Sequence, residues 1–182
     1  MTYAFDAHAS QVRKGTDVPY IAHLLGVASL VLEDGGGEDE AIAALLHDAV
    51  EDQGGGARLK DIERRFGKGV AEIVAGCSDT DLTPKPPWRQ RKEAYLKHLE
   101  TAPPEVVRVS LADKLYNARA IVFDYRRLGE ELWSRFDPGA DQLWYYRSLL
   151  GVYRRVSDSP LVDELARLVS ELEELMSRNR RS

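Results

Sequence analysis

The sequence predicts an all-α protein that folds as a helical bundle, and three observations support this fold class. Apolar residues recur three and four apart over most of the chain, as Ile21, Leu24, Ala28 and Leu32 do, which is the spacing of one helix face. No stretch alternates apolar and polar residues over the length of a strand. Glycine and proline groups separate the helical stretches without any shift in composition, so we expect residues 1–182 to form a single domain.

The helices are expected in the following order. A first helix over residues 2–14 ends near Gly15, and a second runs from about Tyr20 to the glycines at 35–37. A third begins with Glu38, whose charge suits the positive end of a helix dipole, and carries the segment AALLHDAVED. Further helices are expected at 59–66, 68–78, 89–100, 105–128, 138–156 and 160–178, and a loop with three prolines at 79–88.

The segment AALLHDAVED, residues 43–52, concentrates four ionisable side chains: His47, Asp48, Glu51 and Asp52. On a continuous helix they share the face opposite an apolar stripe, and each meets another one turn away. This face holds three acids and no lysine or arginine, and the acids gather at the helix C-terminus, where the helix dipole disfavours them. A bound cation would remove that repulsion. From this helix alone, a metal site and an ordinary solvated face remain equally open.

The segment 105–128 is apolar on most of its circumference, which predicts a buried helix. Asp113 within it therefore needs a partner, either a basic side chain or a metal ion. Lys114 and Arg119 are nearby in sequence but do not lie three or four residues away. Together with His23, His47 and Asp48, Asp113 makes a mixed nitrogen and oxygen ligand set that suits Mn²⁺, Fe²⁺ or Mg²⁺ and can also hold Zn²⁺.

Composition restricts the partners and the setting of the protein. The net charge of −5 argues against a nucleic acid or an anionic membrane as the main partner. The single cysteine, Cys77, excludes an internal disulfide and fits a reducing cytosol, and no signal-peptide or membrane-spanning pattern appears, so we expect a cytoplasmic protein. Leucines spaced four and three apart over 161–175 fit either packing onto the same domain, which we favour, or a homodimer through the C-terminal helix.

Five segments together resemble one known family: residues 7–23, 43–52, 65–79, 89–99 and 107–119. In this order they are similar to the HD superfamily of metal-dependent phosphohydrolases, and within it to the (p)ppGpp hydrolase domain of RelA/SpoT proteins and the stand-alone metazoan SpoT homologues. The similarity covers about residues 3–125, with the helices at about 138–178 following it. It implies an HD-type helical bundle with a metal site at its centre.

The resemblance also implies roles for individual residues. The four that match the family's ligands for one metal ion, usually Mn²⁺, are His23, His47, Asp48 and Asp113, and the pair that matches the family's handling of the attacking water is Glu51 and Asp52. Arg13, Lys14 and Asn117 match positions that line the guanosine pocket. From the residues themselves, Lys114, Arg89, Arg91 and Lys92 are further candidates to neutralise phosphate, and Tyr20 is a candidate contact because it lies close to His23.

Each of these side chains also has an ordinary interpretation. Arg91, with its neighbours Arg89 and Lys92, fits a solvated cationic face, and Arg13 would complement a helix C-terminus. Tyr20 is more simply a packing residue, and we interpret His8 and His98 as structural or surface residues.

The resemblance implies a metal-dependent hydrolase that converts ppGpp or pppGpp to GDP or GTP and pyrophosphate. Two positions depart from the family pattern: Leu24 replaces a proline after the first metal histidine, and Ala120 replaces a threonine of the nucleoside pocket. Ala120 weakens the assignment of guanine specificity, so a phosphohydrolase for another small nucleotide, such as an NADPH 2′-phosphatase, remains an alternative. A nucleotide sensor without catalysis is a second alternative, against which the acids Glu51 and Asp52 argue.

Overall fold

The structure, a computed structural model, describes residues 1–52, 54–80, 84–137 and 141–179. Its helices are α1 (Thr2–Ala7), α2 (Ile21–Glu33), α3 (Glu38–Leu46), α4 (Ala49–Asp52), α5 (Gly55–Phe66), α6 (Lys68–Cys77), α7 (Trp88–Leu99), α8 (Pro104–Leu128), the 3₁₀-helix η1 (Gly129–Arg135), α9 (Gln142–Val156) and α10 (Leu161–Asn179). The all-α prediction is confirmed, since these described ranges contain no β-strand and only an isolated bridge between Val12 and Pro19.

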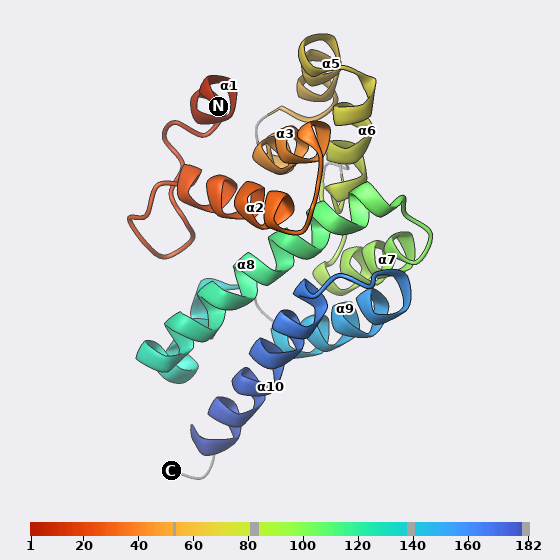
Figure 1. Cartoon of the computed structure of the whole chain (residues 1–182). Coiled ribbons are helices and arrows are strands. Elements are labelled where there is room, and N and C mark those ends of the chain that lie inside the picture. The colour runs from red at the N-terminus through yellow and green to blue at the C-terminus, as the bar shows by residue number, and fades with distance from the viewer. Residues whose placement is uncertain (53, 81–83, 138–140, 180–182) are drawn as a thin grey trace.

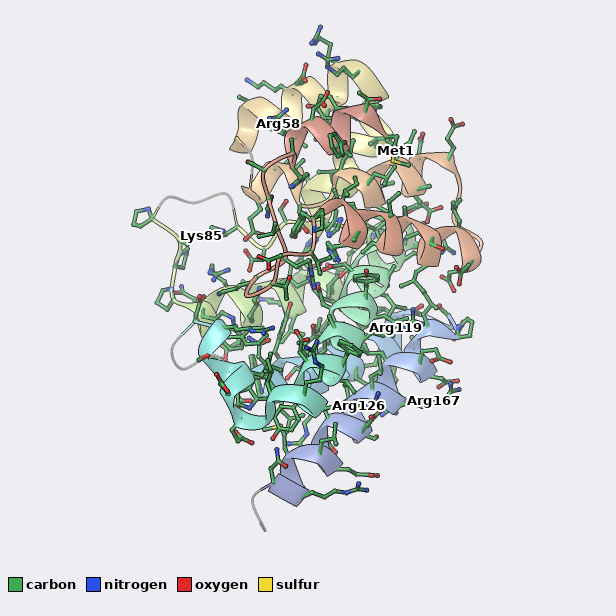
Figure 2. All side chains as sticks on the ribbon, turned by 90° about the vertical axis from the view of Figure 1, so that its left-hand side faces the viewer. Met1, Arg58, Lys85, Arg119, Arg126 and Arg167 are labelled. Carbon is green, nitrogen blue, oxygen red and sulfur yellow. The ribbon has the colours of Figure 1, made fainter. Side chains whose placement is uncertain are left out.

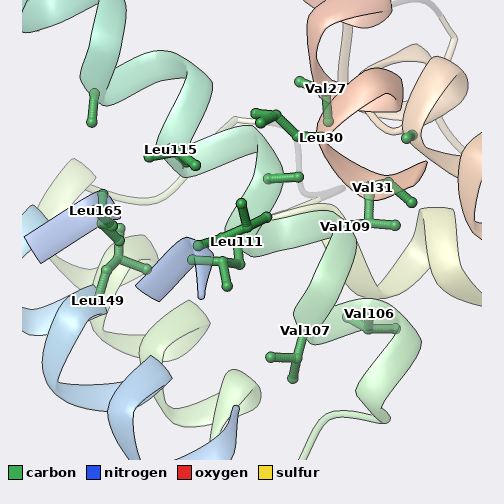
Figure 3. Close-up of a cluster of buried hydrophobic side chains, with 14 of the residues drawn as sticks. Val27, Leu30, Val31, Val106, Val107, Val109, Leu111, Leu115, Leu149 and Leu165 are labelled. Atoms are coloured by element: carbon green, nitrogen blue, oxygen red, sulfur yellow. The ribbon is translucent and has the colours of Figure 1, made fainter. Parts of the chain in front are cut away.

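Helix α8 is the element around which the others pack (Figure 1). It contacts α2, α3, α6, η1, α9 and α10. Figure 3 shows Leu111 between Val27 of α2 and the pair Leu149 and Leu165 of α9 and α10. Because apolar side chains on opposite sides of α8 are buried, the prediction of a buried helix over 105–128 is confirmed.

The ends of α8 follow from its sequence. Pro104 occupies the first turn, where its missing amide hydrogen leaves no bond unmade, and Gly129 after the last turn adopts a φ of 57°, which favours glycine. The helix therefore has a fixed length of 25 residues. Asp113 lies within it, where α2 and α3 pack against it.

The expected first helix over residues 2–14 is wrong beyond Ala7. Residues 8–20 instead form a loop closed by backbone hydrogen bonds from Arg13 N to Val18 O, at 2.8 Å, and from Tyr20 N to Gln11 O, at 2.9 Å. Gly15 turns this loop with a φ of 72°. Arg13 is therefore not at a helix C-terminus, and its predicted role as a dipole partner is wrong.

The helix expected through residues 43–52 is interrupted at His47 and Asp48, between α3 and α4. The His47 ring nitrogen Nδ1 lies 2.8 Å from the Ala44 carbonyl oxygen. A continuous helix would pair that carbonyl with the Asp48 amide, so the imidazole competes with the helical bond. The interruption means that the spacing of a straight helix does not apply to the pair His47 and Asp48.

The C-terminal helix α10 packs against α8, α9 and η1 of the same chain. Leu161, Leu165 and Leu172 are buried there, which confirms the interpretation that this stripe packs onto its own chain. The Ser159 hydroxyl accepts a hydrogen bond from the Leu161 amide at 3.1 Å, as expected of a residue that caps a helix.

Candidate active site

Four side chains from three parts of the fold converge beside α8. His23 comes from α2, His47 and Asp48 from the junction of α3 and α4, and Asp113 from α8. The Asp113 Oδ1 atom lies 3.2 Å from Nε2 of His23 and 3.4 Å from Nε2 of His47. The Asp48 Oδ2 atom lies 3.4 Å and 3.0 Å from the same two nitrogens. The structure thus brings together all four residues that the sequence suggested as ligands.

The chemistry of this cluster fits a bound cation. His47 donates through Nδ1 to the Ala44 carbonyl, so Nε2 is the ring nitrogen that faces Asp48 and Asp113. Among the described residues, Nε2 of both His23 and His47 is buried without a hydrogen bond of suitable geometry, although carboxylate oxygens lie 3.0 to 3.4 Å away. Such burial is costly unless another group binds there. Ligand atoms of His23, His47 and Asp113 lie within 4.8 Å of one another. A divalent metal ion would satisfy these nitrogens and carboxylates together.

Electrostatics keep the two carboxylates of the cluster ionised. Burial opposes charge on His47, but the nearby Asp48 and Asp113 outweigh burial and raise the pKa of His47 well above its usual range. Burial also disfavours the charged carboxylates, yet His47 and His23 hold the pKa of Asp48 well below its usual range. For Asp113, Lys114 and then the two histidines lower the pKa against burial. Ionised carboxylates are the form that binds a cation.

A second layer of side chains orients these four residues. The Tyr20 hydroxyl donates to Asp48 Oδ2 at 2.5 Å, and Asn117, one turn after Asp113, donates to Asp113 Oδ1 at 2.6 Å. Arg13 in turn donates to the Asn117 side-chain oxygen at 2.7 Å. The Lys114 ammonium contacts the other Asp113 oxygen, Oδ2, at 2.5 Å. Hydrogen bonds of this kind fix the orientation of ligands.

Replacing Tyr20 with phenylalanine should weaken metal binding without unfolding the protein. The change removes the hydroxyl that orients Asp48 but keeps the ring, which stacks on His8 with centroids 5.1 Å apart. We expect the dissociation constant for Mn²⁺ to rise about tenfold, as for other outer ligands of metal sites. Isothermal titration calorimetry measures this directly. Tyr3→Phe, which removes a hydroxyl bonded to Asp61, is the control, and equal affinities in the two variants would contradict the role of Tyr20.

A cavity of about 830 Å³ lies beside the cluster. Tyr20, Lys114 and Asn117 line this cavity and also bond to the cluster carboxylates of Asp48 and Asp113. Its charged lining is mostly cationic, with Asp124 as the acid among the described residues of the wall; the cations are Arg13, Lys14, Lys92, Lys114, Arg127 and Arg135. Aromatic rings complete the wall. Cations beside a metal cluster and planar apolar surfaces suit an anionic ligand that carries a flat ring system.

Comparison with known proteins identifies the family. The family model described as HD domain matches residues 1–137. This chain belongs to the HD domain family. The guanosine-3′,5′-bis(diphosphate) 3′-pyrophosphohydrolase MESH1 of Xenopus tropicalis is 39% identical over 135 residues, which are 72% of this chain and 70% of that protein. The human MESH1 protein is 36% identical over the same shares, 72% and 70%. The resemblance inferred from the motifs is thereby confirmed.

Longer relatives and solved structures agree with this membership of the HD domain family. The bifunctional (p)ppGpp synthase/hydrolase SpoT of Escherichia coli K12 is 34% identical over 77% of this chain but only 20% of its own length. A solved structure described as a metazoan ortholog of SpoT that hydrolyses ppGpp matches with a TM-score of 0.76 and 25% identity, over 93% of this chain and 91% of that one. The structure of lmo0812 from Listeria monocytogenes matches with a TM-score of 0.72 and 31% identity, over 82% of this chain and 97% of that one.

The other predicted residues of the HD domain lie at different distances from the cavity. Arg13, Lys14, Tyr20, Lys114 and Asn117 line it. Arg91 does not; its guanidinium bonds to Asp79 at 2.5 Å, and its contact with substrate stays a prediction.

The acidic pair after His47 and Asp48 is described only in part. Glu51 pairs with Lys85 at 2.7 Å, and Figure 2 shows Lys85 on the segment before α7, apart from the labelled arginines of α8 and α10. The side chain of Asp52 lies outside the part of the chain that the structure describes. The roles of Glu51 and Asp52 therefore stay predictions.

Of two further residues that line the cavity, Tyr145 was missed in the sequence, and Lys92 was a candidate that also fitted a solvated cationic face. Tyr145 of α9 is 4% exposed and lines the cavity, and its buried hydroxyl has no hydrogen-bond partner within the described part of the chain. Burial raises the pKa of Tyr145 to about 12, so the phenol stays protonated and can donate. Lys92 lines the cavity with its ammonium 5.2 Å from the Tyr145 ring centroid. Aromatic residues at helical spacing look like core in a sequence, and no feature of the sequence around Tyr145 indicated a position on a cavity wall.

Replacing Asp79 with asparagine should reduce stability and flatten its decline in acid. Asp79 accepts hydrogen bonds from Lys92 and Arg91, and these cations lower its pKa although burial opposes them. Because the folded pKa lies below the unfolded value, the ionised carboxylate stabilises the fold above the unfolded pKa, and this contribution is lost as pH falls through the folded pKa. Urea unfolding between about pH 7 and pH 3 measures it. Parallel pH profiles for variant and wild type would contradict this role.

Proposed function

We propose that this chain is a metal-dependent 3′-pyrophosphohydrolase that converts ppGpp or pppGpp to GDP or GTP and pyrophosphate. The observation that carries the proposal is the cluster of His23, His47, Asp48 and Asp113 beside a cavity with a cationic and aromatic wall. Relatives that share most of their length with this chain are named as hydrolases of this nucleotide, which supports the same substrate here. Water would attack the phosphorus next to the ribose, and the bond from that phosphorus to the 3′-oxygen would break.

The residues of the chain would bind and orient the nucleotide in this reaction. Lys92 and Lys114 face the cavity next to the cluster, where they would neutralise the oxygens of the pyrophosphate group. Tyr145 would donate its phenol hydrogen to the same group, since its buried hydroxyl finds no partner among the residues that the structure describes. Arg13 and Asn117, joined by a hydrogen bond, would contact the nucleoside.

Proton transfer falls to the acids next to the cluster. A divalent ion held by the four ligands, when bound, acts as a Lewis acid and lowers the pKa of a water molecule. Glu51 would accept the proton of the attacking water, and the leaving 3′-oxygen would take up a proton to become a hydroxyl. Lys85, whose ammonium lies 2.7 Å from Glu51, would hold the Glu51 carboxylate in position. We propose Mn²⁺ as the ion, with Fe²⁺, Mg²⁺ and Zn²⁺ as competitors, because the ligand set mixes nitrogen and oxygen.

Product analysis tests the proposal. Purified protein is treated with a chelator, reloaded with Mn²⁺ and incubated with ppGpp, and nucleotides and pyrophosphate are separated by anion-exchange chromatography. We expect GDP and pyrophosphate in equal amounts, and neither in the chelated sample. Parallel loading with the other three ions ranks the metals. Nucleotide binding without turnover under all four ions would end the enzyme proposal and favour a sensor.

A second candidate substrate rests on Ala120, which lines the cavity and offers no hydroxyl to a guanine. A different nucleotide with a phosphate on its ribose, such as NADPH with its 2′-phosphate, would fit the same cationic wall. A nucleotide panel at fixed Mn²⁺ compares kcat/KM for each. If kcat/KM were higher for NADPH than for ppGpp, NADPH would be the preferred substrate in place of the guanosine nucleotide.

Two statements about the setting of the protein also remain proposals. We propose a cytoplasmic protein that acts on a free small nucleotide. Among the described helices, none has the length and apolar character needed to cross a lipid bilayer. A homodimer through α10 is supported only by Leu168 and Leu175, which are half-buried in the single chain. Size-exclusion chromatography with light scattering decides this point, and a monomer at all concentrations would end the dimer proposal.

A further inference from the structure

A chain of three buried hydroxyl groups joins α7, α8 and α9. The Tyr95 hydroxyl lies 2.7 Å from Ser110 Oγ, and Ser110 Oγ lies 2.7 Å from the Tyr153 hydroxyl. The three residues are 2%, 1% and 0% exposed, respectively. Hydroxyl groups in a core are costly unless they are hydrogen-bonded, and the same space could be filled by phenylalanine and alanine without that cost. The chain therefore calls for a reason beyond packing.

Each helix that contributes a hydroxyl also contributes a side chain to one end of the cavity, on the same helix face. Lys92 precedes Tyr95 by three residues on α7, and Lys114 follows Ser110 by four on α8. On α9, Tyr145 lies eight residues, about two turns, before Tyr153. The hydroxyl chain thus lies directly behind the wall formed by Lys92, Lys114 and Tyr145, here called the lysine wall.

The lysine wall is also in contact with the hydroxyl chain. The Lys114 ammonium lies 5.4 Å from the centroid of the Tyr95 ring, while it bonds to Asp113 Oδ2. The Lys92 ammonium lies 5.2 Å from the Tyr145 ring centroid. Lysine side chains are flexible, with four methylene groups each, so a fixed aromatic surface beneath the ammonium limits the directions it can take. The hydrogen bond to Ser110 holds the Tyr95 ring in place.

We infer that Tyr95, Ser110 and Tyr153 are positioning residues that hold the lysine wall in the geometry that binds a pyrophosphate group. They act through Lys92, Lys114 and Tyr145 and do not touch the ligand. Two hydrogen bonds meet at Ser110 and join the three helices there. They fix the mutual register of the helices, and with it the spacing of the two ammonium groups. The inference rests on the proposed function for the identity of the anion. The arrangement of the lysine wall and of the hydroxyl chain behind it does not depend on that function.

The test measures binding of inorganic pyrophosphate, so it does not depend on turnover. Calorimetry on Mn²⁺-loaded protein compares wild type with Tyr95→Phe, Ser110→Ala and Tyr153→Phe. Because each variant cuts the same hydroxyl chain, we expect all three to raise the dissociation constant for pyrophosphate by about tenfold. The affinity for Mn²⁺ should change less than about twofold. Tyr125→Phe removes another buried tyrosine hydroxyl of α8, bonded to Glu130 outside the cavity, and should leave both affinities unchanged.

A double-mutant cycle with Lys114→Met separates positioning from general stability. In the Lys114→Met background, Tyr95→Phe should weaken pyrophosphate binding less than about twofold, because the ammonium it positions is gone. An equal loss in both backgrounds would overturn the inference, as would a wild type that binds no pyrophosphate. If one variant fails to fold, the other two hydroxyl variants give the same cycle. A wild type that shows this coupling but does not hydrolyse ppGpp would refute the proposed function and leave the positioning role intact.

Discussion

Replacing Asp113 with asparagine should abolish both metal binding and hydrolysis. The substitution keeps the shape of the side chain but removes the charge that faces the two histidine Nε2 atoms at 3.2 and 3.4 Å. We expect kcat/KM to fall by about a thousandfold or more, which corresponds to about 4 kcal/mol in transition-state stabilisation. Metal content after dialysis, measured by mass spectrometry, should fall from about one ion per chain to near zero.

The same substitution also leaves Lys114 without its carboxylate partner in a largely buried position. Some loss of thermal stability is therefore expected, and a circular dichroism melt distinguishes it from loss of fold. Asp163→Asn, an exposed acid in the first turn of α10, is the matched control and should retain activity. Full activity or full metal content in Asp113→Asn would refute the ligand set.

Replacing Arg108 with methionine should produce the largest loss of stability at a position outside the ligand cluster. Arg108 of α8 donates to Asp34 Oδ2 at 3.0 Å and to Glu40, while Asp34 also accepts a hydrogen bond from Ser159 at 2.5 Å. The Asp34 and Glu40 carboxylates are 5% and 11% exposed, so the variant leaves two buried acids without their cation. We expect the free energy of unfolding to fall by about 3 to 5 kcal/mol.

Urea unfolding at neutral pH measures the change. Arg155→Met is the control because Arg155 pairs with Glu100 at 2.6 Å on the surface, where both side chains are about half exposed. An exposed pair of this kind contributes about 0 to 1 kcal/mol, so the control should unfold almost as the wild type does. Similar losses in the two variants would show that the buried network has no special weight.

Part of the ligand cluster was predictable from the residues themselves because Asp48 and Asp113 are unusual for their places, whereas His23 was assigned through the family resemblance. An aspartate in a helix that is apolar all round and an acidic helix end both need a compensating charge, and together they indicated a cation. The spacing argument was less accurate, since it assumed a straight helix through His47 and Asp48. The helix is interrupted where the His47 side chain bonds to the Ala44 carbonyl. Hydrophobic periodicity does not reveal a hydrogen bond between a side chain and the backbone.

The cavity wall was predictable only in part. Arg13 and Lys14 were identified through a resemblance, but they were placed on a helix because hydrophobic spacing does not reveal the backbone bonds, Arg13 to Val18 and Tyr20 to Gln11, that close residues 8–20 into a loop. Tyr145 belongs to a helix near the end of the chain and reaches the site only through tertiary packing. Hydrophobic periodicity reports which residues are inside, and it does not separate a core tyrosine from one whose hydroxyl faces a cavity.

The two oxygens of Asp113 face different partners, Oδ1 the histidines and Oδ2 the Lys114 ammonium, and Lys114 also faces the cavity. An anion in the cavity that attracts Lys114 takes positive charge away from Asp113 and leaves the carboxylate a stronger ligand for a cation. Thermodynamic linkage is reciprocal, so a cation at the cluster must strengthen anion binding by the same factor. Metal and nucleotide are thus expected to bind cooperatively, with one shared side chain as the coupling element.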